Sequence, residues 1–206
     1  MVAATLHTDA GPSPEIFTAD GVETSRLRLR MFRPEDLDAM CAITRDAEVM
    51  RYIGHGRPLT REETRENLSR IVSAFRRRGF GRWALELKET GALVGYCGLS
   101  LGNEEVGVEL AYMLSRGAWG RGLALEAGRA SLRYGFERLG VGSIAGLTMQ
   151  DNRRSRRVLE RLGMSFVRDA HFYGFDCAHY AVAREDWRDD GSLYRVTTAE
   201  TFLFNS

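Results

Sequence analysis

The feature that most constrains the fold is a glycine-rich segment, WGRGLALEA, at residues 119–127. Gly120 and Gly122 separate an apolar, strand-like run that ends at Leu114 from a helix-like run that begins at Leu123. Glycine adopts backbone angles that other residues avoid, and the free N–H groups at a helix start attract anions. The segment therefore predicts a strand, a turn and a helix start that together bind a phosphate group.

Two nucleotide-binding motifs do not match this segment. A P-loop requires Lys and then Ser or Thr after its last glycine, but Leu123 follows Gly122. A dinucleotide fingerprint requires Gly or Ala where Leu125 stands, and it requires parallel strands. The third ligand class that could use such a turn is coenzyme A, through its pyrophosphate.

The spacing of apolar residues predicts an α+β domain with hairpins ahead of the glycine-rich turn. Strict alternation at residues 26–31 predicts a strand with one wet face, and two helices are expected between residues 34 and 75. Three closely spaced runs, at residues 82–88, 92–101 and 106–114, predict an antiparallel meander. After the turn we expect a helix, a strand at Ser143–Met149, a helix capped by Asn152 and two closing strands.

The ends of the chain differ in composition from its centre. Residues 1–24 are rich in Gly, Pro, Ser and Thr and are expected to form a loose N-terminal extension. Residues 25–187 are expected to form one domain, and residues 188–206 form a tail of unassigned structure. The N-terminus lacks a basic start and a sustained apolar block, so neither a signal peptide nor a membrane anchor is expected.

The net charge and the cysteine content limit the binding partners and the cellular compartment that we expect for this protein. A formal net charge of +1 gives no overall attraction to nucleic acid or to an anionic membrane, so neither is an expected partner. The three cysteines form no CxxC pair or Cys/His cluster, which predicts a cytoplasmic protein without a metal site. Cys97 is expected to be a small core residue rather than a nucleophile. Lys88 is the only lysine among the 29 basic residues, a skew that codon preference explains.

Four segments in a fixed order carry a family resemblance: TSRLRLRMFRPEDLDAM, ETGALVGYCGL, WGRGLALEA and N-x-x-S-x-x-V-L-E-x-L-G-M. Over residues 24–187 the chain resembles the GNAT superfamily of N-acetyltransferases, and in particular the Rim-type branch, which acetylates ribosomal-protein N-termini and small amines. The resemblance implies a mixed, mostly antiparallel central sheet of about seven strands flanked by about four helices. One departure is at the first position of the family's Q/R-x-x-G-x-G/A motif, which falls on Gly117, with Arg116 one place early.

The resemblance also implies how acetyl-CoA binds as a cosubstrate. The backbone of Met113 and Leu114 would pair with the pantetheine arm where that strand diverges from Ser143–Met149, and Asn152 would bond to the same arm. The pyrophosphate would bind at the turn and helix start, at Trp119, Gly120, Arg121, Gly122, Leu123 and Ala124.

Glu109 is the candidate general base, acting through water. It lies between Gly107 and Ala111 on one face of its predicted strand, and such small neighbours leave room for a ligand. The opposite face carries Val106, Val108, Leu110 and Tyr112. The alternative is a structural carboxylate paired with an arginine or a backbone N–H.

Ser155 is the second catalytic candidate. It occupies the apolar stripe of its predicted helix, and the matching serine of the Rim-type branch lies near the cofactor sulfur. The tyrosine that protonates the thiolate in other family members would fall at Leu159 and is absent. Ser155 would assist the leaving thiolate or bind pantetheine; the alternative is a hydroxyl bonded to the preceding helical turn.

We therefore expect an N-acetyltransferase that moves an acetyl group to a primary amine, either a protein N-terminus or a small molecule, by direct attack in a ternary complex. The alternative is a non-catalytic module of the same fold that binds acyl-CoA as a sensor or an assembly partner. The resemblance is also compatible with a homodimer.

Overall fold

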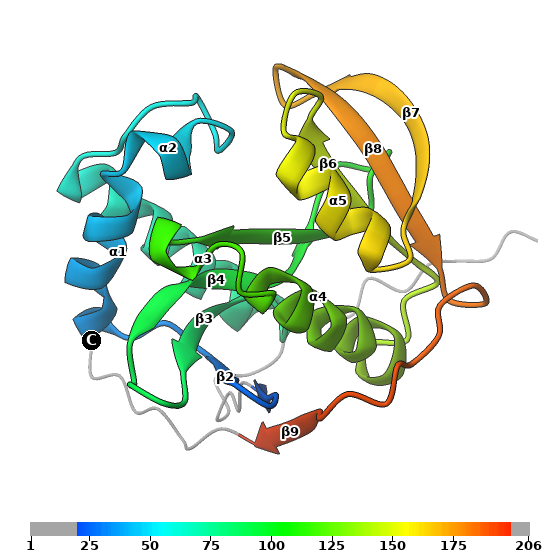
Figure 1. The fold of residues 1–206 in the computed structure, drawn as a ribbon, viewed down its shortest axis with the longest axis horizontal. Coiled ribbons are helices and arrows are strands. Elements are labelled where there is room, and N and C mark those ends of the chain that lie inside the picture. Colours follow the sequence, from blue (N-terminus) through cyan, green and yellow to red (C-terminus); the bar gives the residue numbers. More distant parts are fainter. Residues whose placement is uncertain (1–19, 199–206) are drawn as a thin grey trace, which may run out of the picture.

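A computed structural model describes residues 20–198, which form one mixed sheet with helices on both faces (Figure 1). Within this part of the chain the sheet has nine strands in the order β7-β8-β6-β5-β4-β3-β2-β1-β9. Every neighbouring pair is antiparallel except β5 and β6. The strands are β1 (Asp20–Glu23), β2 (Leu27–Arg30), β3 (Arg82–Leu87), β4 (Leu93–Leu101), β5 (Val108–Leu114), β6 (Ser143–Met149), β7 (Ser165–Phe172), β8 (Phe175–Ala183) and β9 (Arg195–Thr198).

The helices divide between the two faces of the sheet. In Figure 1, α4 lies in front of the sheet and α3 behind it, with α1 and α2 at one end and α5 beside β7 and β8 at the other. The helices are α1 (Leu37–Thr44), α2 (Ala47–Met50), α3 (Arg61–Arg78), α4 (Leu123–Arg133) and α5 (Arg153–Arg161), with short turns η1 (Pro34–Asp36), η2 (Arg116–Ala118) and η3 (Tyr134–Arg138). None of the helices described here has the length and apolar character needed to cross a membrane.

Each face of the sheet has its own apolar core. Trp83, Leu99 and Leu110 pack with α4 and α5 on one face, and Ala84, Tyr96 and Met113 pack with α1–α3 on the other. Strand alternation explains this division, because consecutive side chains point to opposite faces. The α+β architecture and the antiparallel meander β3-β4-β5 confirm the expectation from the sequence.

Both ends of the described chain add strands that the sequence analysis did not assign. β1 falls in the segment expected to be a loose extension, and β9 falls in the unassigned tail; the two pair with each other at the sheet edge. Each is four residues long, too short for alternation to reveal, and each is stabilised by a partner far away in the sequence. Residues 1–19 of the expected extension lie outside the described part.

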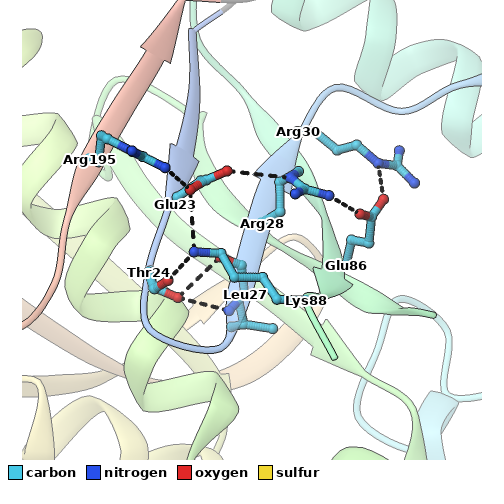
Figure 2. A network of polar contacts seen from close by, with 8 residues as sticks. All are labelled: Glu23, Thr24, Leu27, Arg28, Arg30, Glu86, Lys88 and Arg195. Atoms are coloured by element: carbon cyan, nitrogen blue, oxygen red, sulfur yellow. Dashed lines mark hydrogen bonds and ion pairs between the residues drawn. The ribbon is translucent and has the colours of Figure 1, made fainter. Parts of the chain in front are cut away.

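A chain of charges joins these added strands to the rest of the sheet (Figure 2). The Glu23 carboxylate bonds Arg195 of β9, Lys88 and Arg28, and Glu86 bridges Arg28 to Arg30. The pKa of Glu23 is lowered to about 2, mainly by the hydrogen bond from Arg195. Burial raises this pKa, and the hydrogen bond from Lys88 lowers it further. Lys88 also donates to the Thr24 carbonyl oxygen at 2.6 Å.

The sheet opens between β5 and β6. β5 pairs with β4 at seven consecutive residues, but it pairs with β6 only at Glu109 and Ala145. Beyond that pair, residues 110–114 of β5 and 146–149 of β6 diverge, and we call the space between them the seam. This divergence confirms the expectation that β5 splays from Ser143–Met149.

Candidate active site

The glycine-rich turn forms an anion-binding shape at one end of the seam. Gly120 and Gly122 have φ of 73° and 75°, and open space surrounds the position where a Cβ on Gly120 would lie. Gly122 begins α4 without a side-chain cap, whereas Thr60 caps α3 and Asn152 caps α5. The first N–H groups of α4, from Leu123 onward, are thus left for an external acceptor.

The turn is held from outside by the loop between β1 and β2. The Arg26 guanidinium donates to the Arg121 carbonyl oxygen at 2.8 Å and bonds the Glu126 carboxylate on α4. Glu126 also accepts from the Thr24 hydroxyl at 2.6 Å and from the Arg26 backbone N–H. These bonds fix the orientation of the Arg121 carbonyl group and join the turn to the loop between β1 and β2.

The last residue of β5 faces the seam. The Ser115 N–H bonds Val94 of β4, so the backbone polar groups of Leu114 point the other way, toward β6. There the Leu114 carbonyl accepts from the Trp119 indole at 2.8 Å. The Arg154 guanidinium of α5 lies 4.9 Å from the centre of the Trp119 ring, so the turn and α5 meet across the seam. Met113, in contrast, directs its backbone groups to β4.

A cleft of about 1160 Å³ joins the two faces of the sheet through the seam. Asn152, Ser155 and Tyr112 line it on the side of α5, and Glu109, Ala111 and Met113 line it on the side of α3. The wall opposite β5 consists of the α2–α3 loop and the β7–β8 hairpin, whose His55 and Phe175 rings lie 6.1 Å apart. The cleft thus extends from Asn152 and Ser155, at the start of α5, to the space under this wall.

Glu109 sits on the floor of the α3 side of the cleft. Its carboxylate accepts from the Ser100 hydroxyl at 3.1 Å and from the Tyr173 hydroxyl at 3.4 Å. Within residues 20–198 no arginine or lysine lies within ion-pair distance of it. Tyr173 is 55% exposed and has φ of 54° at the tip of the β7–β8 hairpin, a conformation unusual for a tyrosine. The carboxylate is therefore partly exposed to the cleft and is held by hydroxyl groups alone.

Ser155 and Tyr112 form a pair on the α5 side. Their hydroxyl groups lie 2.8 Å apart, and the Tyr112 hydroxyl also donates to the Ser155 carbonyl oxygen at 3.2 Å. Burial raises the pKa of Tyr112 above its usual range, against the hydrogen bond from Ser155, which lowers it. The phenol therefore stays neutral at physiological pH and can act only as a hydrogen-bond donor or acceptor. The Ser155 N–H bonds the Asn152 cap at 3.2 Å.

The sequence identifies the family to which this fold and site belong. The family model described as the acetyltransferase (GNAT) domain matches residues 26–165. The chain belongs to the GNAT acetyltransferase family. It is 34% identical over 147 residues to YkkB of Bacillus subtilis, an uncharacterised protein, an alignment that covers 69% of this chain and 84% of that relative.

Solved structures of GNAT proteins have the same fold. A GNAT-family acetyltransferase from Bacillus anthracis superimposes with a TM-score of 0.70 at 26% identity, over 80% of this chain and 99% of its own. A ribosomal-protein-S5-alanine acetyltransferase from Vibrio fischeri superimposes with a TM-score of 0.65 at 15% identity, over 82% of this chain and 98% of its own. At that identity the second likeness shows the fold alone.

Several side chains singled out in the sequence belong to the core of the GNAT domain. Cys97 is fully buried, and burial raises the pKa of its thiol to about 12, so it is a core residue as expected. Trp83 is fully buried as well. The described residues contain no group of three or more His, Cys, Asp or Glu side chains arranged to hold a metal ion.

Sequence reasoning missed three residues that hold this GNAT site together: Arg26, Tyr112 and Tyr173. Strand alternation put Tyr112 on the correct face but gave no sign of its bond to Ser155, 43 residues away. Alternation assigned Arg26 to a strand, whereas it precedes β2 in the turn after β1. Tyr173 stands in a hairpin turn, where no periodicity operates. Neither position gave a sign of its hydrogen-bond partner.

Proposed function

We propose that this GNAT enzyme transfers the acetyl group of acetyl-CoA to a primary amine by direct attack in a ternary complex. The observation that carries the proposal is the cleft that passes through the seam, from Asn152 and Ser155 on one face of the sheet to the Glu109 carboxylate on the other. In this arrangement the cofactor and the acceptor approach from opposite faces of the sheet. Their reacting groups then meet at the seam.

The cofactor would bind along the turn and the seam. Backbone N–H groups from Gly120 to Ala124 would hold the pyrophosphate, where the helix start favours negative charge. The pantetheine arm would lie beside the seam-facing backbone of Leu114, with Asn152 and Ser155 opposite. Arg154, stacked on Trp119, adds positive charge at the same end.

The reaction requires one bond to form and one to break. The neutral amine attacks the thioester carbonyl carbon, the C–N bond forms, and collapse of the tetrahedral adduct breaks the C–S bond. Glu109, through a water molecule, takes the proton that the amine loses. For this step the Tyr112 hydroxyl donates its hydrogen bond to the Ser155 Oγ, so that the Ser155 hydroxyl can donate a hydrogen bond to the departing thiolate, and the thiolate is protonated from solvent. Tyr112, which stays neutral, orients the Ser155 hydroxyl and loses no proton.

The Rim-type branch remains a proposal. It is supported by the four ordered motifs in the sequence and is compatible with the fold. The near-neutral net charge favours a free amine as acceptor over a protein N-terminus on the highly charged ribosome surface.

The function is tested by release of the CoA thiol from acetyl-CoA across a panel of primary amines. We expect at least one acceptor to drive release, and Glu109→Gln to lower kcat about a hundredfold or more while acetyl-CoA affinity changes little. Glu105→Gln, an exposed carboxylate in the nearby β4–β5 loop, serves as the matched control and should retain activity. Tight binding of acetyl-CoA without release by any amine would support the non-catalytic module instead.

A further inference from the structure

The α3 side of the cleft contains a cation that no residue of the described chain neutralises. Arg82, the first residue of β3, lines the cleft, and its guanidinium lies 5.5 Å from the centre of the Tyr96 ring. Between residues 20 and 198 no carboxylate lies within ion-pair distance of it. Arg57 bonds Glu63 and Arg70 bonds Asn67, whereas Arg77 and Arg78, at the end of α3, also line the cleft. Arg82 differs from these four because it lies on the sheet itself, on the same face as Glu109.

Arg82 and Glu109 border the same small area of the sheet. Arg82 pairs with Gly98 of β4, and Gly98 pairs with Ala111 of β5, so the floor between the strands carries almost no side chain. Ser100 and Glu109 form the next pair on that face. Two strand spacings, about 10 Å, and one two-residue step, about 7 Å, separate Arg82 from Glu109 along the backbone. The long side chains of Arg82 and Glu109 can span much of the distance between their backbones and still leave room for a small molecule between their charged groups.

Tyr173 bonds the Glu109 carboxylate and is close enough to Arg82 to be affected by its charge. Burial is the main cause that raises the pKa of Tyr173; the Glu109 charge raises it further, and the Arg82 charge lowers it. Both charged groups therefore act on the same phenol at the tip of the β7–β8 hairpin. This common neighbour places the guanidinium and the carboxylate at one end of the cleft.

We propose that the acceptor carries a carboxylate close to its amine, as an α-amino acid does. This inference rests on the proposed function and names the substrate class of the same site. The amine lies toward Glu109 and Ser100, and the carboxylate bonds the Arg82 guanidinium, whose fork of N–H groups matches two carboxylate oxygens. A protein N-terminus has a neutral peptide carbonyl in that place and leaves Arg82 without a partner.

The test compares amino acids with their own carboxamides as acceptors, with rates expressed per concentration of free amine. We expect the wild type to favour the acid by about tenfold or more in kcat/KM. Arg82→Ala should lower kcat/KM for the acid by about tenfold to a hundredfold and leave the carboxamide and the KM for acetyl-CoA nearly unchanged. Arg82→Lys should retain part of the preference, and Arg70→Ala, on the same cleft, should retain all of it.

Binding of the same compounds to the CoA-loaded protein, measured by calorimetry, separates the two proposals. If the protein acetylates the acid and its carboxamide at equal rates, the proposal of an amino-acid acceptor is wrong, but the proposed acetyltransferase reaction is still supported. The same conclusion follows if Arg82→Ala lowers kcat/KM equally for both compounds. Binding of acids that depends on Arg82 without any transfer upholds the Arg82 site and overturns the proposed reaction. Absence of both binding and transfer for amino acids overturns the inference.

Discussion

At the scale of single residues, the pair of Tyr112 and Ser155 explains how a serine hydroxyl on a helix can be directed toward the seam. A helical serine usually bonds back to the preceding turn, which directs its hydroxyl along the helix. Here the Tyr112 hydroxyl from β5 bonds both the hydroxyl and the carbonyl oxygen of Ser155 and holds the side chain at the seam. A neutral phenol can do this at any physiological pH.

Tyr112→Phe is expected to lower kcat by about tenfold and to change the KM for acetyl-CoA much less, because the ring still fills its place but no longer orients Ser155. Ser155→Ala should give a similar loss. Because the two residues act together, the double variant should lose little more than either single variant. Steady-state kinetics of the four proteins check this; losses that multiply would show that the two hydroxyl groups act independently.

The sequence could predict some of these residues and not others. Glu109 was identified because alternation and small neighbours set it apart on its strand. Its partners Ser100 and Tyr173 were not, since a hydrogen bond across the sheet or from a hairpin tip depends on tertiary packing. Arg82 carried no signal at all, because an unpaired cation is recognised only when its surroundings are known.

At the scale of elements, α4 differs from α3 and α5 in the way it begins. Thr60 and Asn152 cap their helices with side-chain oxygens, but Gly122 offers none. A glycine N-cap in place of Ser, Thr, Asp or Asn costs only a few tenths of a kcal/mol, but it leaves the first N–H groups of the helix without a side-chain acceptor. A bound pyrophosphate would restore those hydrogen bonds, so cofactor binding and helix stability are expected to be coupled.

Gly122→Asp should weaken acetyl-CoA binding at least tenfold, because it adds a side chain and a like charge where the pyrophosphate would lie. Arg26, whose Nη2 lies 3.6 Å from the position of the new Cβ, would hold that carboxylate in place. Gly91→Asp is the matched control: its φ of 69° is similar, nothing lies within 4 Å of the position of its new Cβ, and it lies in the β3–β4 turn. Calorimetry and thermal unfolding of both variants make the comparison. Unchanged affinity in a folded Gly122→Asp protein would contradict this cofactor site.

The longer elements were predictable and the shortest were not. The α+β class, the meander and the helix after the turn follow from periodicity over seven or more residues. β1, β9 and α2 are four residues each, and their formation depends on partners or packing elsewhere in the chain. The seam was expected from the family resemblance alone, since no local pattern marks where two strands diverge.

At the scale of the whole molecule, the segment after β8 ties distant parts together. It crosses α4, where Asp190 pairs with Arg129 at 2.8 Å and Asp189 pairs with Arg133 at 3.1 Å. It then adds β9 to β1, and Arg195 bonds Glu23. Since Thr24 and Arg26 follow directly and support the glycine-rich turn, this edge of the sheet also stabilises that turn.

The bond between Arg195 and Glu23 predicts a particular pH dependence of stability. The folded protein holds the pKa of Glu23 at about 2, below its ordinary value of 4.5, so the bond stabilises the folded state above pH 4.5. That contribution is lost as the pH falls from about 4.5 toward 2. The difference in unfolding free energy between the wild type and Arg195→Ala should therefore shrink over this range.

Urea unfolding at a series of pH values measures this difference. In a Glu23→Gln background the effect of Arg195→Ala should no longer vary with pH, because no carboxylate remains to titrate. A difference that stays constant from neutral pH to pH 2.5 in the wild-type background would show that Arg195 acts through packing of β9 rather than through the charge of Glu23.

The same network has a consequence for an enzyme that works on amines in the presence of a reactive thioester. Arginine stays protonated and is a poor nucleophile, so a chain whose cations are arginines offers acetyl-CoA few sites for accidental self-modification. Its one lysine amine is already bonded to the Thr24 carbonyl and the Glu23 carboxylate, which hold it at the edge of the sheet. The protein is thereby shielded from its own cosubstrate, and amine-directed labels should react sparingly with its side chains.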